Sequence, residues 1–363
     1  MKTITQRFVL HLGYSCNERC RFCYYRDSLE NNSVKDLSTN EIKKRLISGR
    51  RYKKEAIDLS GGEPTIRKDL PEIIQYAKSI GYKTICVITN GIAMARKEKC
   101  KMYIKCGLND VLFSLHSARE DLHDYLTRTS GSWKKLNLAM KNLQELGTNF
   151  RINTVVNNLN YNDMDNYFQF IKQYHPKTIN LLIYNSAEEC GTCNDDNIHI
   201  TDYQPVSNSV IEALNKYSGD FEQINVRFMP FCLLKGHEDK IRTMWQKIYE
   251  SEEWDPVLFM KFRKNNFFLF MGFVLGLFVS PFKQPYYGKK SIYTWICEIV
   301  QNGRIFYNNQ QTKECKSCSL RKICPGISRG YIKKYPVHVE PYDGTVVKDP
   351  IFFCKNNKSF VCN

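Results

Sequence analysis

Short apolar runs rich in β-branched residues alternate with helix-like patterns over the first half of the chain. The apolar runs predict strands at residues 7–14, 56–62, 83–91, 110–116, 150–157 and 178–185. Apolar residues at helical spacing predict helices at 38–49, 68–82, near 94–106, 132–147 and 161–174. Strands that alternate with helices form a parallel sheet. Six such units with short connections favour an α/β fold, a partial (β/α)6 barrel.

Polar and glycine motifs follow the predicted strands. In chain order they are Cys16, Cys20 and Cys23, then Gly61-Gly62-Glu63-Pro64, then Thr89-Asn90-Gly91, and finally Ser114-Leu115-His116. Asn153 lies within the fifth strand and is expected to face inward. Each motif alone would indicate an ordinary turn. Because the carboxyl ends of parallel strands meet at one edge of a sheet, together they predict a functional site.

The cysteine content indicates metal ligation rather than disulfide bonding. The chain has 363 residues and 15 cysteines, an odd number that cannot all pair into disulfides. Its N-terminus has no apolar signal segment, so we expect a reducing, cytoplasmic location and metal ligation. A hydrophobic content of 42% and a charged content of 25% are ordinary for a globular protein and exclude wholesale disorder.

Six cysteines fall into two groups, Cys16-x3-Cys20-x2-Cys23 and Cys315-x2-Cys318-x5-Cys324. Cys86, Cys100 and Cys106 lie in apolar or helical segments and are expected to be small buried side chains. Cys190 and Cys193 form an isolated C-x2-C pair, which is weak evidence for a metal site.

Three thiolates in the first group leave one position of a four-ligand metal site open. A zinc site would take His11 or His116 as its fourth ligand. A [4Fe–4S] cluster would instead keep one iron free to bind a small molecule and to pass it an electron.

The first cysteine group and the glycine motif together resemble the radical S-adenosylmethionine superfamily. Phe22 completes the family signature C-x3-C-x-aromatic-C, and the GGEP motif is intact at residues 61–64. The resemblance covers roughly residues 7–185. It implies that Cys16, Cys20 and Cys23 hold a [4Fe–4S] cluster, whose fourth iron is chelated by the amino group and carboxylate of S-adenosylmethionine.

The resemblance also implies contacts to S-adenosylmethionine. Gly61 and Gly62 would approach its amino group with their backbone, Glu63 would complement that charge, and Phe22 would meet the adenine. The sulfonium, carboxylate and ribose contacts would fall to Thr89, Asn90, Ser114 and Asn153. One-electron reduction of the sulfonium would then give methionine and a 5′-deoxyadenosyl radical, which abstracts a substrate hydrogen. The family further implies a low-potential electron donor such as flavodoxin or ferredoxin.

The second cysteine group indicates a metal site that is zinc or iron–sulfur by spacing alone. After such a barrel it resembles the auxiliary-cluster extensions called SPASM and twitch domains. Asn308 and Ser328 stand where the SPASM pattern has cysteines, so we expect one auxiliary [4Fe–4S] cluster. Its fourth ligand is expected to be Cys232, with Cys354 as the alternative.

These features predict a core barrel at 1–190, a connecting region at 191–290 and an auxiliary-cluster domain at 291–363. The connecting region contains an uncharged apolar stretch at 265–282, expected to be buried or interfacial, with a peripheral membrane contact as the alternative. The formal net charge of +16 comes from short clusters, which are typically solvated surface. No nucleic-acid-binding module is evident.

The expected function is that of a radical S-adenosylmethionine enzyme acting on a peptide or a small molecule. Maturation of a peptide or natural product is favoured because auxiliary-cluster extensions of this kind are common in maturases. The first strand begins near residue 7, so we expect no peptide-recognition domain before the barrel, which keeps small-molecule, lipid-precursor or cofactor biosynthesis open. RNA modification is a further enzymatic alternative, and a structural metal-binding protein is the non-enzymatic one.

Overall fold

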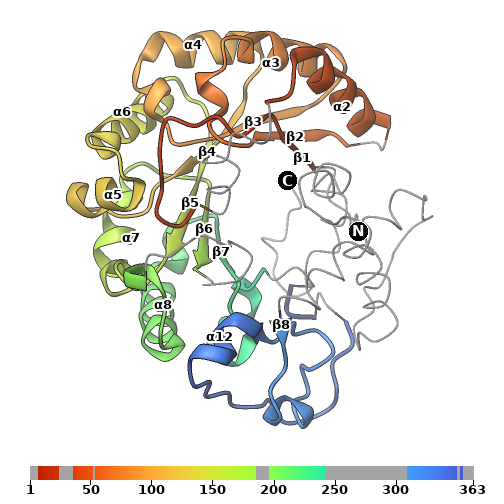
Figure 1. Cartoon of the computed structure of the whole chain (residues 1–363), viewed down its shortest axis with the longest axis vertical. Helices are drawn as coiled ribbons and strands as arrows, with labels where there is room; N and C mark the ends of the chain where they lie inside the picture. Colours follow the sequence, from red (N-terminus) through yellow and green to blue (C-terminus); the bar gives the residue numbers. More distant parts are fainter. Residues whose placement is uncertain are drawn as a thin grey trace.

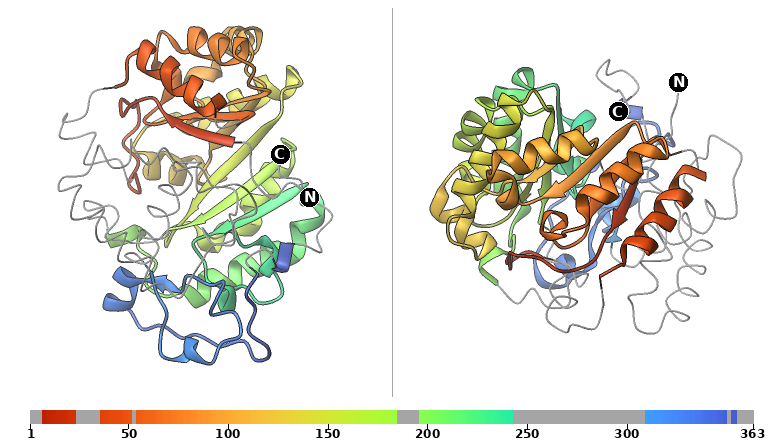
Figure 2. Two further views of the ribbon diagram at one scale, coloured as in Figure 1. Left: turned by 90° about the vertical axis from the view of Figure 1, so that its right-hand side faces the viewer. Right: turned by 90° about the horizontal axis from the view of Figure 1, so that it is seen from above.

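A computed structural model (Figure 1) describes residues 7–23, 36–51, 54–184, 196–242, 309–349 and 352–354. Seven strands form one parallel sheet whose spatial order, β1 to β7, is the order along the chain. The sheet curls into a half-barrel, and the helices cover its outer face (Figures 1 and 2). The predicted α/β partial barrel is therefore confirmed.

The strands are five to seven residues long: β1 (Arg7–His11), β2 (Ala56–Ser60), β3 (Thr84–Thr89), β4 (Asp110–Ser114), β5 (Phe150–Val156), β6 (Thr178–Ile183) and β7 (Gln223–Arg227). The helices of the barrel are α2 (Thr39–Arg51), α3 (Leu70–Ser79), α4 (Lys97–Cys106), α5 (Glu120–Thr127), α6 (Ser132–Glu145), α7 (Met164–Lys172) and α8 (Tyr203–Tyr217). The six predicted strands correspond to β1–β6. The seventh, β7, comes from the segment that we expected to connect two domains, and α5 and α8 were not predicted.

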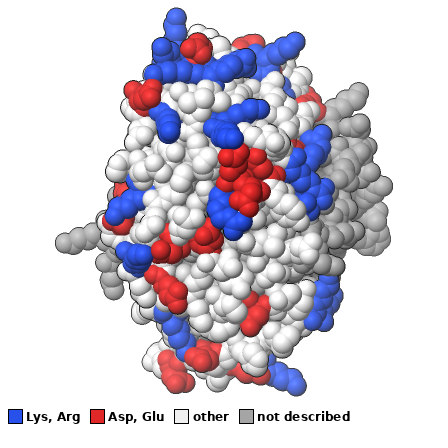
Figure 3. Space-filling model, turned by 90° about the vertical axis from the view of Figure 1, so that its left-hand side faces the viewer, with Lys and Arg blue, Asp and Glu red and all other residues white. Residues whose placement is uncertain are grey.

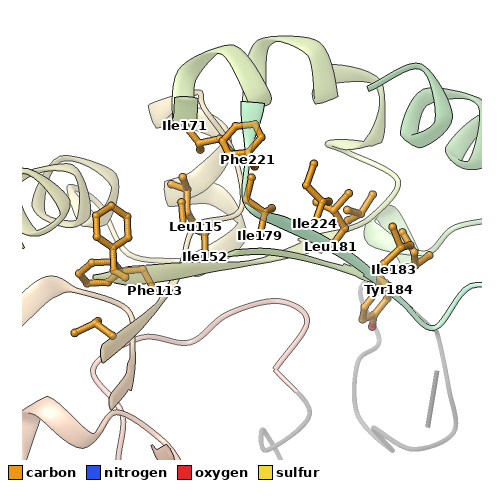
Figure 4. Close-up of a cluster of buried hydrophobic side chains, with 14 of the residues drawn as sticks. Phe113, Leu115, Ile152, Ile171, Ile179, Leu181, Ile183, Tyr184, Phe221 and Ile224 are labelled. Atoms are coloured by element: carbon orange, nitrogen blue, oxygen red, sulfur yellow. The ribbon is translucent and has the colours of Figure 1, made fainter. Parts of the chain in front are cut away.

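The two faces of the sheet differ in polarity. Along β5, Ile152 and Val156 are fully buried against the helices, whereas Arg151, Asn153 and Val155 are half-buried on the inner face. Ile171 of α7 and Phe221 lie over the outer faces of the last three strands, beside Ile152, Ile179 and Ile224 (Figure 4). The apolar core therefore lies between the sheet and the helices, which leaves the barrel interior free to carry polar side chains.

Local signals in the sequence explain where some helices begin. The Ser38 amide donates to Glu41 Oε2 at 2.8 Å, and the Glu41 amide returns a bond to Ser38 Oγ at 3.3 Å. This reciprocal capping box opens α2. Asp202 caps α8 by accepting from the Gln204 amide at 2.9 Å.

A small C-terminal module packs beside α8 and the end of β7 (Figures 1 and 2). It contains the antiparallel pair β8 (Asn309–Gln310) and β9 (Ile327–Ser328), followed by α12 (Arg329–Lys334). The Tyr331 ring lies 4.3 Å from the Tyr203 ring, centroid to centroid. The Tyr342 hydroxyl donates to the Phe231 carbonyl at 3.2 Å. These contacts fix the module to the segment that follows the sheet.

The helical face of the molecule carries charges of both signs (Figure 3). On the helical face, Lys and Arg side chains are interspersed with Asp and Glu (Figure 3). Several of them pair across neighbouring helices, as Lys216 does with Asp165 at 2.6 Å. This distribution agrees with the interpretation of the clusters as solvated surface.

Two of the predictions concern parts of the chain outside the described residues, namely the apolar stretch 265–282 and the Cys190/Cys193 pair. Within the described ranges, no helix is both long and apolar enough to cross a membrane.

Candidate functional site

The loop after β1 carries the three cysteines of the first group. The Arg19 and Arg21 amides tie it to the end of α5 by donating to the carbonyls of Thr127 and Leu126, at 3.2 and 2.8 Å. The loop is therefore held over the carboxyl edge of the sheet, which is the position predicted from the sequence.

The three thiols lie close enough to influence one another. Burial raises the pKa of Cys16 to about 12 and that of Cys20 well above its ordinary value. Negative charge on Cys23 raises both pKa values further. Thiols in such surroundings ionise when a positive metal centre lies beside them, so this group fits an iron–sulfur cluster.

Glycines allow the GGEP turn to pack directly against the cysteine loop. A Cβ on Gly62 would lie 2.2 Å from the Ser15 carbonyl oxygen, and one on Gly61, whose φ is +134°, would lie 2.4 Å from that of Gly13. The close approach permits two backbone hydrogen bonds, from Gly62 N to Gly13 O at 2.9 Å and from Glu63 N to Ser15 O at 2.8 Å. In this structure the two glycines therefore position the loop that carries the cysteines.

The Glu63 carboxylate joins the turns after β2 and β3. It is 3% exposed. Its Oε1 accepts from the Thr65 amide at 2.9 Å and from the Thr89 hydroxyl at 2.7 Å, and its Oε2 accepts from the Asn90 amide at 2.8 Å. Burial raises the pKa of Glu63, and the hydrogen bonds act in the opposite direction. These bonds fix the carboxylate in place, and its expected role beside an amino group stays a prediction.

Asn90 extends this network to the cysteine loop. Its Nδ2 donates to Asn17 Oδ1 at 2.9 Å, and its Oδ1 accepts from the Ile92 amide at 3.1 Å. Thr89 and Asn90 thus hold the turn after β3 against its two neighbours. Both side chains lie at the edge where the sequence predicted the site.

Glu18, inside the cysteine loop, was not singled out from the sequence. It is 4% exposed, and its Oε2 accepts from Cys20 Sγ at 3.4 Å. Its Oε1 is buried and has no hydrogen-bond partner among the described residues. A buried carboxylate oxygen of this kind fits a donor or positive group that these residues do not supply. No pattern marks such a residue, because a glutamate in a loop is ordinarily solvated.

Phe22 lies against a pair of buried histidines. Its ring meets the His116 ring edge-on, with centroids 4.5 Å apart, and His116 stacks on His123 at 5.7 Å. Each imidazole accepts a backbone N–H, from Val155 to His116 Nδ1 and from His116 to His123 Nδ1, both at 3.2 Å. Burial lowers the pKa of both histidines. Phe22 is therefore backed by neutral rings at the place where an adenine is expected.

The expected contacts Ser114 and Asn153 are neighbours across the sheet. Ser114 of β4 pairs with Asn153 of β5, and the same register continues to Asn180 of β6 and Asn225 of β7. Asn180 and Asn225 were missed in the sequence. The signal that could have found them is an Ile-Asn step repeated in three strands, at 152–153, 179–180 and 224–225.

The amino end of the barrel interior holds an ion-pair cluster of Arg7, Asp58, Cys86, Asp110 and Arg151. Arg151 binds Asp110 at 2.6 Å, and it also lies 3.5 Å from Asp58 Oδ1 and 3.2 Å from Cys86 Sγ. Arg7 forms a second ion pair with Asp58. Cys86 is buried as predicted, although its surroundings are charged rather than apolar. This cluster fills the end of the interior opposite the site.

Four cysteines line one hollow between the barrel and the C-terminal module. The hollow is partly open to solvent, and its walls include Cys232, Cys315, Cys318 and Cys324. Cys232 follows β7, whereas the other three belong to the module. Burial raises the pKa of Cys232 to about 11, and the charges of Cys315 and Cys318 add to this effect. The fourth cysteine favoured from the sequence therefore lies beside the other three.

Donors surround the sulfur atoms of this hollow. The Tyr342 amide donates to Cys318 Sγ at 3.4 Å, and the Thr312 hydroxyl lies 3.4 Å from Cys315 Sγ. The Gly326 amide lowers the pKa of Cys324, against the larger effect of burial. Donors at sulfur are typical of thiolate ligands. Cys354 lies in the described short helix 352–354, but its side chain is not described.

Single-ion sites are a separate question. Nowhere in the described ranges do three or more His, Cys, Asp or Glu side chains form a group that could hold one metal ion. The ligands of a four-iron cluster need no such arrangement, because each thiolate binds a different iron.

Comparison with known proteins agrees with this geometry. Residues 10–171 match the family described as the radical SAM superfamily. These residues belong to the radical S-adenosylmethionine (radical SAM) superfamily. The match confirms the resemblance drawn from the sequence over these residues, and it supports the predicted enzyme class and the two predicted cofactors, a [4Fe–4S] cluster and S-adenosylmethionine. Membership in this family favours the cluster over zinc for the first cysteine group.

The radical SAM relatives have different names. A probable GTP 3′,8-cyclase of Methanococcus vannielii is 33% identical over 46% of this chain and 54% of its own length. An Fe-coproporphyrin III synthase of Methanosarcina barkeri is 31% identical over 46% of this chain and 40% of its own length. The chain thus spans about half or less of the length of these curated relatives.

Solved structures extend the likeness beyond the radical SAM domain. Streptococcus suis SuiB bound to S-adenosylmethionine has a TM-score of 0.56 and 15% identity, over 95% of this chain and 77% of that chain. SuiB bound to the precursor peptide SuiA gives a TM-score of 0.55 at 15% identity, over 97% and 76%. This likeness shows that the two proteins share their fold.

Proposed function

We propose that this chain reductively cleaves S-adenosylmethionine and uses the resulting 5′-deoxyadenosyl radical to abstract a hydrogen atom during maturation of a peptide or natural product. The observation that carries the proposal is the convergence of three segments on Glu63. Its backbone amide bonds the cysteine loop at Ser15, and its carboxylate bonds the GGEP turn and the turn after β3. A [4Fe–4S] cluster on Cys16, Cys20 and Cys23 supplies the electron when it is bound.

The protein side of the reaction is binding, orientation and exclusion of water. Phe22 presents an aromatic ring backed by His116, which suits stacking against a purine. Ser114 and the Nδ2 of Asn153 face the interior as hydrogen-bonding groups for a carboxylate or a ribose. The buried carboxylate of Glu18, with one oxygen that no described residue satisfies, suits the positive charge of S-adenosylmethionine.

We further propose that Cys232, Cys315, Cys318 and Cys324 hold one auxiliary [4Fe–4S] cluster. Their placement around one hollow and the donors at their sulfur atoms support it. Four thiolates would saturate the cluster, so it would relay electrons or shape the substrate site rather than bind substrate through iron.

Peptide or natural-product maturation is supported by the fold shared over 95% of the chain with SuiB, a protein solved with its precursor peptide SuiA. The second candidate is cofactor biosynthesis, which is favoured by relatives named GTP 3′,8-cyclase and Fe-coproporphyrin III synthase. A low-potential donor such as flavodoxin or ferredoxin would serve either reaction. The two classes differ in which added compound raises the yield of 5′-deoxyadenosine, a peptide or a small molecule such as GTP.

The central test is anaerobic reconstitution followed by dithionite reduction with S-adenosylmethionine. We expect 5′-deoxyadenosine and methionine from the wild-type chain and none from a variant with Cys16, Cys20 and Cys23 replaced by Ala. A fully reconstituted wild-type chain that yields no 5′-deoxyadenosine would leave only the structural metal-binding alternative.

Iron counting tests the auxiliary cluster. We expect about eight irons per wild-type chain and about four in the triple Ala variant. The single variants Cys232→Ser and Cys354→Ser form a matched pair, and we expect only Cys232→Ser to lose the auxiliary cluster. About twelve irons in the wild type would contradict a single auxiliary cluster, and loss of iron in Cys354→Ser alone would assign the fourth ligand to Cys354.

A further inference from the structure

Three asparagine side chains form a hydrogen-bonded row across the last three strands of the barrel. Asn225 Nδ2 donates to Asn180 Oδ1 at 2.8 Å, and Asn180 Nδ2 donates to Asn153 Oδ1 at 2.8 Å. Gln223 Nε2 donates to Asn225 Oδ1 at 3.0 Å and closes the far end. We call Asn153, Asn180 and Asn225 the amide row.

The row exists because the three strands are in register. Asn153 is paired with Asn180, and Asn180 with Asn225, so each amide stands one strand spacing of about 4.8 Å from the next. The preceding isoleucine in each strand points to the helices and is at most 3% exposed. The strand register therefore places three amides side by side on the inner face of the sheet.

All bonds of the row run in one direction, and this direction determines what the row presents to the site. Each amide oxygen accepts from the next amide, so Asn153 Oδ1 is occupied, whereas Asn153 Nδ2 has no partner among the described residues. The donor end of the row thus lies beside Ser114, on the side of the cysteine loop. Linked amides polarise one another, which strengthens the terminal donor.

An unsupported asparagine can turn its amide by 180° and present oxygen instead of NH2 at little cost. An oxygen in that place would repel a carboxylate. The bond from Asn180 removes this freedom, and the bond from Asn225 holds Asn180 in turn. The orientation of the Asn153 amide is therefore set by residues on two other strands, Asn180 on β6 and Asn225 on β7.

We propose that Asn180 and Asn225 are positioning residues, which hold the Asn153 amide with its NH2 group toward the carboxylate or ribose of S-adenosylmethionine. This inference rests on the proposed function, because it assigns the ligand of that same site. The inference goes beyond the proposed function because it gives a role in binding to two residues that do not need to touch the ligand.

A double-mutant cycle on binding tests the inference. The dissociation constant of S-adenosylmethionine is measured by equilibrium dialysis on the anaerobically reconstituted chain, for wild type, Asn180→Leu, Asn153→Ala and the double variant. One neutral hydrogen bond corresponds to about a fivefold change, so we expect Asn180→Leu to weaken binding about fivefold. In the Asn153→Ala background the same substitution should change the constant less than about twofold, because the group it orients is gone.

Controls separate positioning from a general effect on folding. Asn208→Leu, on the exposed side of α8, removes an asparagine outside the row and should leave the constant unchanged. Iron content and the melting temperature identify any variant that fails to fold. If Asn180→Leu fails in this way, Asn180→Ser and Asn225→Leu replace it in the same cycle, with the same expected loss of coupling.

Two results would overturn the inference. One is an Asn180→Leu substitution that weakens binding equally in the wild-type and the Asn153→Ala backgrounds. The other is an Asn180→Leu substitution that leaves the dissociation constant of the wild-type background unchanged. A wild-type chain that makes 5′-deoxyadenosine while giving either result would leave the proposed function intact. A reconstituted wild-type chain that binds no S-adenosylmethionine would refute the proposed function and the role of the amide row together.

Discussion

A methyl group at Gly62 should disconnect the GGEP turn from the cysteine loop. The added Cβ would lie 2.2 Å from Ser15 O and 2.4 Å from Tyr14 O, and both obstacles are backbone atoms that cannot rotate away. Ordinary contact begins near 3.4 Å, so the two segments must separate by about 1 Å. That movement breaks the bonds of 2.9 and 2.8 Å between them.

The magnitude follows from these contacts. Two backbone hydrogen bonds contribute about 1 kcal/mol each, and forced overpacking adds about 1–3 kcal/mol. We therefore expect Gly62→Ala to lower the free energy of unfolding by about 3–5 kcal/mol. Because the cysteine loop moves with Ser15, iron incorporation at the first cysteine group should fall as well. Urea denaturation of the apo-protein measures the first effect, and iron analysis after reconstitution measures the second.

Gly219→Ala is the matched control. A Cβ on Gly219 meets nothing within 4 Å, so this variant should change the free energy of unfolding by no more than about 0.5 kcal/mol. A Gly62→Ala chain that unfolds like the control and binds as much iron would refute the close-approach argument.

Other predictions concern buried charge. Arg151→Met should lower the free energy of unfolding by about 3–5 kcal/mol. Among the described residues it leaves the buried Asp110 carboxylate with only the Arg7 guanidinium, at 3.9 Å. Urea denaturation measures this, and a loss below about 1 kcal/mol, as expected for an exposed pair, would contradict it. Burial lowers the pKa of His123 from 6.5 to about 4, so the unfolded chain takes up the proton first, and stability is lost as the pH falls from about 6.5 to 4. Between pH 7.5 and 5, His123→Gln should reduce the loss by about 2 kcal/mol, and equal losses in both proteins would disprove this.

The parts of the fold that the sequence predicted are those with one strong periodic signal. β1 to β6 are apolar enough for their runs to stand out, and the cysteine and GGEP motifs are specific. β7 was missed because QINVR alternates polar and apolar residues over only five positions. Its polar residues face the interior, so half of the apolar signal of a parallel strand is absent.

The site residues that were missed depend on tertiary pairing. Glu18 is distinguished by burial, and Asn180 and Asn225 are distinguished by strand register, which local patterns do not encode. The role of Cys232 as the fourth ligand beside Cys315, Cys318 and Cys324 stays a prediction, and it is supported by the position of Cys232 in the wall of their hollow. Sequence separation of more than 80 residues between Cys232 and Cys315 left that pairing to resemblance alone.

The site depends on the shared register of four residues, Ser114, Asn153, Asn180 and Asn225. It is therefore sensitive to shifts in strand register, which point substitutions do not produce. Side chains alternate between the two faces of a strand, so a slip of one residue in β6 would turn Asn180 toward the helices and Leu181 into the interior. Insertions or deletions of a single residue within these strands should therefore abolish ligand binding even where the sheet still forms. Length changes in the helices or in the loops at the opposite edge leave the register intact, and these are the places where the chain can vary in length.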